Sequence, residues 1–513
     1  MVALSKLAKL FKREVSKVAA LEVDAKLEVE KEVSSRVESF DGLVQWYWLD
    51  KPYAAVAVVK RDGLYSYNVV TPALSFNELE VLNRVYYRLV DKLCVLREDA
   101  HKAFEREALK LIKAYLPGVD KVSCEKLLYY LRRKVFGFDV LDPIFKDVMV
   151  EDIACNGPDL PVFVYHMGYG FVKTNIALPQ DYLDDYVCHL AELTGHTLSA
   201  GSPFVEASLP DGSRLTAFWR KELCDRGTSF SIRKFRYEPL TPLDLIRLNT
   251  FSIDSIALLW LLVESGANML VVGGTASGKT TTLNALCLFI PENRRVVSIE
   301  DTRELKLYHD NWIPLIARED RQVEGSSERM GSMFLLKRAL RMRPEYLLVG
   351  EVRGKEARIM FQAMNTGHIV YSTIHAGSAE EAFIRLTNPP ISVPPAMMLP
   401  LDIVIVQALT QREGKDVRRC LFIAEVEEVS ASQGFVKLSP IYSYDLSSDS
   451  LIPVGQPKKA IKKACIRLGF SESQFFEEFE ARKACLYKAL LRGVSKVDDF
   501  LKLVRSYRRG LIV

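Results

Sequence analysis

With 513 residues the chain is too long for one hydrophobic core, and its length predicts about three domains. Its composition, 49% hydrophobic and 26% charged, is typical of a globular protein, and a formal net charge of only +4 argues against a broad basic face for nucleic acid. Nine scattered cysteines without a CxxC pair argue against a zinc ribbon or a disulfide framework and favour a reducing, cytoplasmic setting.

The N-terminal extension, residues 1–35, contains two patterns. Residues 1–18 place apolar side chains at helical spacing and carry a net charge of +4, which predicts a basic amphipathic helix. Such a helix caps its own domain, or it lies on an anionic membrane or a partner. Residues 21–30 alternate apolar and charged side chains, which predicts a strand, with a continuing helix as the alternative. No apolar run approaches the roughly 18 residues of a spanning helix, so we expect a soluble protein.

Residues 36–141 predict a mixed, mainly helical domain. Apolar segments at Val44–Leu49 and Ala54–Lys60 predict strands around turns such as Asp62-Gly63. Between residues 75 and 136 apolar side chains recur at helical spacing. Strand signals then return, and residues 142–240 predict a small α/β (PAS-like) module that ends in a proline-containing linker.

Residues 241–452 alternate helices with short apolar strands, which predicts an α/β fold with a mostly parallel sheet and helices on both faces. We place its strands at Asn268–Val272, Arg295–Ile299, Tyr346–Val349, Ile369–Ser372 and Ile403–Ala408. Residues 453–513 are charged and predict helices, with helix starts at Ser471 and Ser495.

A phosphate-binding loop occupies residues 273–280, which match the pattern GxxxxGK[ST] at every required position. An apolar strand precedes it and a helix start follows it, the context that a phosphate cradle needs. Lys279 can reach the β- and γ-phosphates of ATP, and the Thr280 hydroxyl can bind Mg²⁺. The predicted nucleotide-binding residues are Gly273, Gly274, Thr275, Ala276, Ser277, Gly278, Lys279, Thr280 and Thr281.

Acidic residues follow two further strands of the predicted sheet. Glu351 ends the strand at 346–349, and Gly350 stands where an aspartate usually precedes it, so Glu351 is the candidate for activating water. Glu300 and Asp301 end another strand and can hold the water or contact Mg²⁺. Because the carboxyl ends of parallel strands open onto one crevice, we expect these carboxylates to face the phosphates. The predicted metal ligands are Thr280, Glu300 and Glu351.

Two histidines, His368 and His375, bracket the strand at 369–372. A neutral imidazole can donate to a γ-phosphate oxygen and so report its presence. They lack the spacing and companion ligands of a zinc site.

These motifs together resemble the secretion ATPases of type II and type IV systems, including the motors of type IV pili and archaeal flagella. The resemblance covers roughly residues 145–410. The segment 298–304 is similar to the family's Asp box, 349–357 to its Walker B segment, and 366–376 to its His box. The sequence Asp-Thr-Arg-Glu at 301–304 is closer to the archaeal branch, and the chain lacks the four-cysteine zinc site that many bacterial members carry.

The resemblance implies a RecA-like ATPase domain in a homohexameric ring, with ATP and Mg²⁺ bound between that domain and the small N-terminal module. The module, here residues 142–240, would transmit force to a polytopic membrane protein and indirectly to pilin-like subunits, from the cytoplasmic face of the membrane. Arg214 and Arg233 are the candidates for stabilising transition-state charge, with Arg318 and Arg329 behind them.

Two other functions remain open from the sequence. One is a nucleic-acid translocase of the conjugation type, against which the modest net charge and the lack of interleaved basic and aromatic runs argue. The other is a nucleotide-gated scaffold with little turnover, against which the complete acidic set argues. The load of the motor, whether assembly, rotation, retraction or secretion, does not follow from the sequence.

Overall fold

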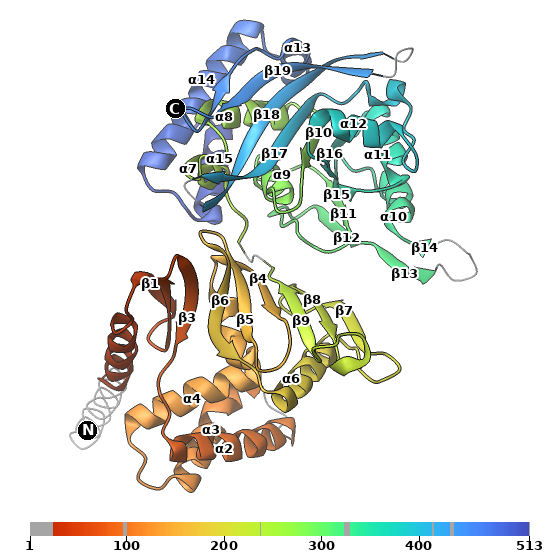
Figure 1. The fold of residues 1–513 in the computed structure, drawn as a ribbon. Coiled ribbons are helices and arrows are strands. Elements are labelled where there is room, and N and C mark those ends of the chain that lie inside the picture. The colour runs from red at the N-terminus through yellow and green to blue at the C-terminus, as the bar shows by residue number, and fades with distance from the viewer. Residues whose placement is uncertain are drawn as a thin grey trace, which may run out of the picture. The chain divides into compact units, whose positions relative to one another are not determined.

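The structure is a computed structural model that describes residues 24–95, 100–235, 238–322, 329–412, 415–430 and 435–511. The chain forms two compact units, the first ending at Phe235 and the second beginning at Arg236 (Figure 1). The helix predicted over residues 1–18 lies outside the described residues. No helix in the described part of the chain has both the length and the apolar character needed to cross a membrane.

The first unit is built on a nine-stranded sheet with the order β1-β2-β3-β6-β5-β4-β9-β8-β7. Its strands are β1 (Leu43–Asp50), β2 (Ala54–Arg61), β3 (Leu64–Val70), β4 (Val150–Cys155), β5 (Pro161–His166), β6 (Gly170–Ala177), β7 (Phe204–Ser208), β8 (Arg214–Phe218) and β9 (Ser229–Arg233). Its α-helices after residue 75 are α2 (Phe76–Val95), α3 (Ala100–Tyr115), α4 (Lys121–Phe136), α5 (Asp142–Lys146) and α6 (Gln180–Leu193).

A further helix covers residues 24–38, so the strand predicted over residues 21–30 is wrong from residue 24 onward. Val29, Val33 and Val37 are fully buried against β1 and β2. Their spacing of four residues places them on one helix face. Apolar residues four positions apart also fit a pattern that alternates every two residues. The sequence alone therefore left both a strand and a helix open for this segment.

One sheet crosses the boundary predicted at residues 141 and 142. The only described pairing between the two sides is β3 with β6, which runs parallel through Ser66↔Lys173 and Tyr67↔Thr174. The Asn175 amide extends this seam, because it accepts from the Val69 N–H at 2.9 Å and donates to the Val69 carbonyl at 3.0 Å. The N-terminal strands therefore add to the module's sheet through a short contact. The predicted division into five separate regions stays a prediction.

The second unit has a nine-stranded sheet with the order β12-β11-β15-β16-β10-β17-β18-β19-β20. The pairs from β12 to β17 are parallel, as predicted, and those from β17 to β20 are antiparallel. The strands are β10 (Met269–Gly273), β11 (Val296–Glu300), β12 (Trp312–Ile316), β15 (Tyr346–Val352), β16 (Ile369–His375), β17 (Ile403–Arg412), β18 (Lys415–Ser430), β19 (Phe435–Asp445) and β20 (Ser450–Pro453). A separate two-stranded sheet pairs β13 (Arg318–Gln322) with β14 (Arg329–Met330).

Helices cover both faces of this sheet (Figure 1). The first face packs against α7 (Pro242–Arg247), α8 (Ile253–Glu264), α9 (Lys279–Cys287), α13 (Lys458–Leu468), α14 (Glu472–Leu491) and α15 (Val497–Arg508). The second face packs against α10 (Ser332–Ala339), α11 (Glu356–Asn365) and α12 (Ala379–Thr387). The predicted α/β fold with helices on both faces is confirmed.

The C-terminal helices belong to the same core as α8. The Trp260 ring stacks on Phe289 with centroids 4.9 Å apart and contacts Tyr507 at 5.0 Å. Beside it, Glu264 accepts from Arg482 of α14 and Arg508 of α15, each at 2.6 Å. These contacts attach the last helices to the nucleotide-binding unit.

Two predicted helix starts have different outcomes. Ser471 is the N-cap of α14 and forms a capping box with Gln474, as predicted. Ser495 does not cap α15; the N-cap is Lys496, and no side chain caps that helix. At the start of the second unit, Thr241 caps α7 in a capping box with Asp244. Part of the predicted linker therefore belongs to the fold of this unit.

Candidate active site

The phosphate loop has the strand–loop–helix geometry that its sequence predicts. β10 ends at Gly273, and α9 begins at Lys279 with Gly278 as its N-cap. Gly278 has φ 92° and Ala276 has φ 58°, so the loop turns twice through the left-handed region. Thr280 and Thr281 lie in the first turn of α9, where unpaired backbone N–H groups favour an anion.

Gly273 stands where the loop packs most tightly. A Cβ there would lie 2.6 Å from the Gln407 carbonyl oxygen and even closer to the Ser277 hydroxyl. At Gly274, by contrast, a Cβ would meet nothing within 4 Å. Gly273, the first glycine of the motif, is therefore required by packing, whereas Gly274, at a variable position of the motif, faces open space.

Lys279 is turned into its own loop in this structure. Its Nζ donates to the Gly274 carbonyl at 2.6 Å. Burial lowers the pKa of Lys279, and the carboxylates of Glu351 and Glu304 oppose that shift. The carboxylates of Glu351 and Glu304 therefore lie close enough to favour the charged form of this lysine.

Four neighbouring strands bring their carboxyl ends to the same edge of the sheet. β10, β16, β15 and β11 follow one another in the sheet order, and all are parallel. Gly273 pairs with His375, and Ile299 pairs with Val349. The phosphate loop, His375, Glu351 and Glu300 therefore line one edge, as the sequence predicts for parallel strands.

Glu300 is buried, with 3% of its surface exposed. Its Oε1 accepts from the N–H groups of Glu304 and Leu305, both at 2.8 Å. Its Oε2 is buried without a hydrogen-bond partner among the described residues. Burial raises the pKa of Glu300 to about 7, although the two backbone hydrogen bonds act in the opposite direction. The free oxygen is suited to a cation or to a water molecule.

Gly350 makes room for this carboxylate. A Cβ on Gly350 would lie 3.0 Å from the Glu300 Cγ, closer than side chains normally approach. An aspartate at position 350 would therefore compete with Glu300 for the same space. The glycine that replaces the usual aspartate of β15 allows the carboxylate of β11 to occupy that place.

Glu351 lies in a β-bulge at the end of β15. The register with β16 passes from Val349↔Ser372 to Val352↔Ile374, which leaves one extra residue on β15. Val349 and Val352 both pack in the core of the second face, so the bulge absorbs the odd residue at Gly350 and Glu351. The Glu351 carboxylate accepts from Arg353 at 2.7 Å.

Arg353 links the acidic residues, and the sequence assigned it no role. It also pairs with Asp301 at 3.4 Å. Asp301 accepts from the Ser332 hydroxyl at 3.1 Å and is more exposed than Glu300. Arg353 thus neutralises two carboxylates beside the phosphate loop.

The two histidines do not lie together. His375 ends β16 beside Gly273, whereas His368 precedes the same strand at the opposite edge of the sheet. A strand of seven residues spans about 23 Å, so His368 lies too far from the phosphate loop of this chain to contact phosphates bound there. Its Nδ1 instead contacts the Thr366 hydroxyl at 3.1 Å and the Ala363 carbonyl at 3.3 Å. The hypothesis that a histidine beside β16 donates to a γ-phosphate oxygen therefore does not fit His368 at this loop, and it stays a prediction for His375.

The candidate arginines of the first unit are neighbours. Arg214 on β8 pairs in register with Arg233 on β9. Arg214 bonds to Glu206, and Arg233 donates to Asp152 at 3.2 Å. Both side chains are substantially exposed. Their role at a nucleotide stays a prediction.

The other two candidate arginines lie on the small β13–β14 sheet of the second unit. Arg318 pairs with Met330, and Arg329 pairs with Gln322. Both are exposed. Neither has a described contact with the phosphate loop, and their role also stays a prediction.

Two further residues near the loop were not identified from the sequence. Arg418 on β18 donates to the Ala276 carbonyl at 2.8 Å. Gln407 on β17 pairs with Gly273 and is 1% exposed, and its amide atoms have no partner among the described residues. Neither position belongs to a sequence motif, because both residues are far from the loop in sequence and come close to it only when the strands of the sheet pair.

Within the described ranges no group of three His, Cys, Asp or Glu side chains is arranged to hold a metal ion on its own. Mg²⁺ characteristically takes one or two protein ligands and completes its shell with phosphate oxygens and water. The Thr280 hydroxyl and the unpaired oxygen of Glu300 fit that pattern.

Comparisons with known proteins agree with the motifs. A family model described as "Type II/IV secretion system protein" matches residues 189–439. An uncharacterized protein of Methanocaldococcus jannaschii is 36% identical over 393 residues, covering 75% of this chain and 70% of that protein. The type IV secretion system protein PtlH of Bordetella pertussis is 31% identical over 319 residues, covering 55% of this chain and 92% of that protein.

Among solved structures, the Legionella pneumophila ATPase DotB is similar to this chain. The match has 17% sequence identity and a TM-score of 0.42, and it covers 72% of this chain and 90% of DotB.

Proposed function

The chain belongs to the type II/IV secretion system ATPase family, whose members hydrolyse ATP, and from this premise we propose that it is a cytoplasmic motor for a pilus-like or secretion machine. The motor would work as a homohexamer at the cytoplasmic face of the membrane. It would couple ATP hydrolysis to the assembly, movement or secretion of pilin-like subunits through a polytopic membrane protein.

One observation carries the hydrolytic part of the proposal. The phosphate loop, Glu300, Glu351 and His375 share the carboxyl edge of one parallel sheet. That edge supplies a phosphate-binding loop together with acidic groups. A scaffold that binds nucleotide without turnover would need the loop but not the acidic groups.

The chain's own residues divide the work at this edge. Lys279 exchanges its bond to the Gly274 carbonyl for the β- and γ-phosphates of ATP. Glu351 orients a water molecule for in-line attack on the γ-phosphorus and accepts its proton, and ADP leaves with phosphate as the other product. For this step Arg353 must release Glu351, and negative charge on the nucleotide favours that release.

Mg²⁺ would be held by Thr280 and Glu300 together with phosphate oxygens. Bound there, the ion supplies charge neutralisation on the phosphates. Its positive charge would also favour the ionised form of Glu300, which burial disfavours.

The adjacent cations Arg214 and Arg233 would supply charge to the transition state from the N-terminal module. Their existing partners are Glu206, which is exposed, and Asp152, which is half-buried, and ion pairs made by exposed arginines are weak enough to exchange. Movement of the module during turnover would then transmit force to the membrane partner.

The hydrolytic proposal is tested with two single substitutions. Lys279→Ala should abolish nucleotide binding, and Glu351→Gln should keep ADP and ATP binding while turnover falls by about 100-fold or more. Phosphate release and the binding of a fluorescent ADP analogue measure the two effects. Near wild-type hydrolysis by the Glu351→Gln protein would show that another group activates the water.

The motor proposal is tested by assembly and by partner. Light scattering of the full chain should show a sixfold ring that ATP forms or tightens, and a monomer at high protein concentration with nucleotide would refute the ring. Reconstitution with a co-encoded polytopic membrane protein should stimulate ATP hydrolysis. Stimulation by DNA instead, with a steep dependence on salt, would identify a nucleic-acid translocase.

A further inference from the structure

Arg418 reaches the phosphate loop from a strand that none of the motifs includes. Its Nε donates to the Ala276 carbonyl at 2.8 Å. Its Cδ would be 3.3 Å from a Cβ placed on Gly278, so the side chain lies along the loop. Ala276 is the non-glycine residue of this loop with a positive φ, 58°. The contact therefore falls on a residue whose backbone conformation is uncommon for any residue other than glycine.

A β-bulge directs Arg418 toward the loop. The register between β17 and β18 passes from Val406↔Phe422 to Gln407↔Cys420, which leaves Leu421 as an extra residue. Cys420 consequently packs in the same core as α9. Arg418, two residues earlier on the strand, shares that face.

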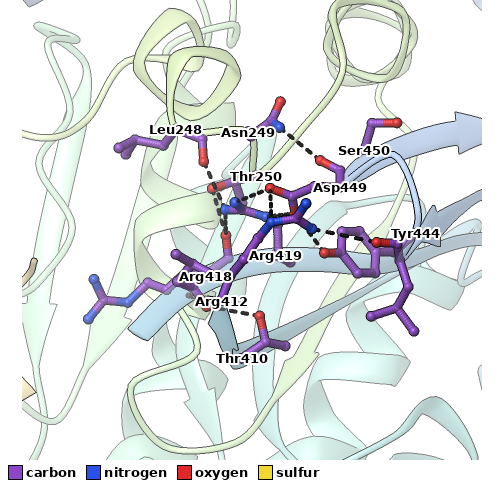
Figure 2. Close-up of polar contacts among 12 residues, drawn as sticks. Leu248, Asn249, Thr250, Thr410, Arg412, Arg418, Arg419, Tyr444, Asp449 and Ser450 are labelled. Carbon is purple, nitrogen blue, oxygen red and sulfur yellow. Dashed lines mark hydrogen bonds and ion pairs between the residues drawn. The ribbon is translucent and has the colours of Figure 1, made fainter. Parts of the chain in front are cut away.

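The next residue, Arg419, anchors this part of β18. It is 6% exposed, and it donates to both oxygens of Asp449 at 2.8 and 2.9 Å. It also donates to the Leu248 carbonyl at 2.9 Å. Figure 2 shows Arg419 within this polar cluster and the Arg418 side chain extending away from it.

The backbone of Arg418 is held from two sides. Its carbonyl accepts from the Thr250 hydroxyl at 3.1 Å and from the Arg419 guanidinium at 3.0 Å. The cluster thus fixes the point from which the Arg418 side chain starts. A side chain with a fixed origin loses less entropy when it bonds to the loop.

The geometry points to Arg418 as a positioning residue of the phosphate loop, acting through the peptide that joins Ala276 to Ser277. In a trans peptide the carbonyl and the following N–H point in opposite directions. A donor fixed on the Ala276 carbonyl therefore sets the direction of the Ser277 N–H, one of the groups available to a phosphate. Arg418 keeps the loop in its binding conformation before nucleotide arrives. This inference rests on ATP binding at the loop and is independent of the motor's load.

The test compares Arg418→Ala with Arg418→Lys in the full chain. We expect Arg418→Ala to weaken ADP binding and raise the KM for ATP by about tenfold, with kcat changed by less than about threefold, because one charge-assisted hydrogen bond is lost before chemistry begins. Arg418→Lys should recover most of the affinity, since an ammonium can also donate to one carbonyl. The fluorescent ADP analogue and steady-state phosphate release provide both measurements.

Arg412→Ala is the matched control. Arg412 pairs at 3.4 Å with Asp449, the carboxylate that also holds Arg419, and it has no described contact with the loop. Loss of the Arg412 side chain should therefore leave the KM for ATP and the ADP affinity unchanged. The inference is overturned if the ADP affinity and the KM for ATP of the Arg418→Ala protein both stay within twofold of the wild-type values. It is also overturned if kcat falls as much as affinity and lysine does not rescue it, since Arg418 would then contact the reacting phosphate. Neither result would alter the outcome expected for Lys279→Ala.

Discussion

Two glutamates of the second unit, Glu300, which is buried, and Glu264, with 10% of its side chain exposed, have opposite electrostatic surroundings. Glu264, at the end of α8, accepts from Arg482, Arg508 and the Trp260 indole. Burial favours its neutral form, but the charges of the two arginines outweigh burial and lower the pKa of Glu264. Glu300, at the end of β11, has one oxygen that no described residue contacts by a hydrogen bond, and burial raises the pKa of Glu300 to about 7.

The contrast separates a carboxylate that supports the fold from one that is available for chemistry. A buried charge is tolerated when its hydrogen bonds and counter-charges are complete. Glu264 meets that condition and attaches the C-terminal helices to α8. Glu300 does not, so its position costs folding free energy, and that cost is explained if the group serves the nucleotide.

The largest effect is expected at Glu264. Glu264→Gln removes the charge that Arg482, 4% exposed, and Arg508 require. The variant should lose about 3 kcal/mol of stability at pH 8, because Arg508 loses the carboxylate with which it pairs, whereas Arg482 keeps its ion pair with Glu478. Hydrogen exchange of α8 and α14 in increasing urea measures this loss.

Glu472→Gln, an exposed residue of the first turn of α14, is the control and should change stability by less than about 0.5 kcal/mol. Turnover per folded molecule should stay near wild type in both variants. A Glu264→Gln protein as stable as wild type would show that the two arginines find other partners.

The same substitution at Glu300 should have the opposite sign. The pKa of Glu300 is about 7 in the fold against an ordinary value of 4.5. The folded state therefore holds the proton more tightly than the unfolded state, and this adds to the free energy of unfolding below pH 4.5. That stabilisation is lost as the pH rises to 7. At pH 8, in EDTA and without nucleotide, Glu300→Gln should therefore be more stable than wild type, by at most about 3 kcal/mol. Urea unfolding of β11, followed by hydrogen exchange at pH 5 and pH 8, measures the difference.

The gain at Glu300 should come with a loss of ATP turnover, as expected when a strained site is relaxed. A stability difference that is the same at pH 5 and pH 8 would mean that the carboxylate is ionised in the fold throughout, contrary to the contrast with Glu264.

The smallest effect is expected at Gly350. A Cβ there meets the Glu300 Cγ at 3.0 Å, so Gly350→Ala should displace the carboxylate by a few tenths of an ångström. We expect kcat to fall by about tenfold with the KM for ATP little changed, since active-site geometry tolerates little displacement. Gly201→Ala, where the nearest atom is 4.0 Å away, is the control. Unchanged kcat in the Gly350→Ala protein would mean that the position of Glu300 is not limiting.

Much of the nucleotide-binding unit could be predicted because its signals are local. The apolar runs at 268–272 and 346–349 are buried strands with few alternatives. The loop at 273–280 carries its glycines at fixed offsets from Lys279. The capping box at Ser471 is likewise contained within four residues.

What could not be predicted depends on contacts between distant segments. The antiparallel strands β18 to β20 went unrecognised, because hairpin pairing shows no helix-like or crossover pattern along the chain. His368 was placed at the site because closeness in sequence to β16 does not say which end of the strand meets the phosphates. Arg418 reaches the loop across 142 positions of sequence, which no motif records.

By itself the sequence determined the chemistry available to this protein: a phosphate loop, the acidic residues that end β11 and β15, and an α/β fold whose strands end at one edge. Tertiary structure decided which of those groups meet and in what state. The bulge at Gly350 and Glu351, the burial that leaves Glu300 with a free oxygen, and the pairing that brings Arg418 to Ala276 all arise between strands. The backbone hydrogen bonds of a helix join residues four positions apart, whereas the hydrogen bonds, register and burial of a strand depend on the strands that pack beside it.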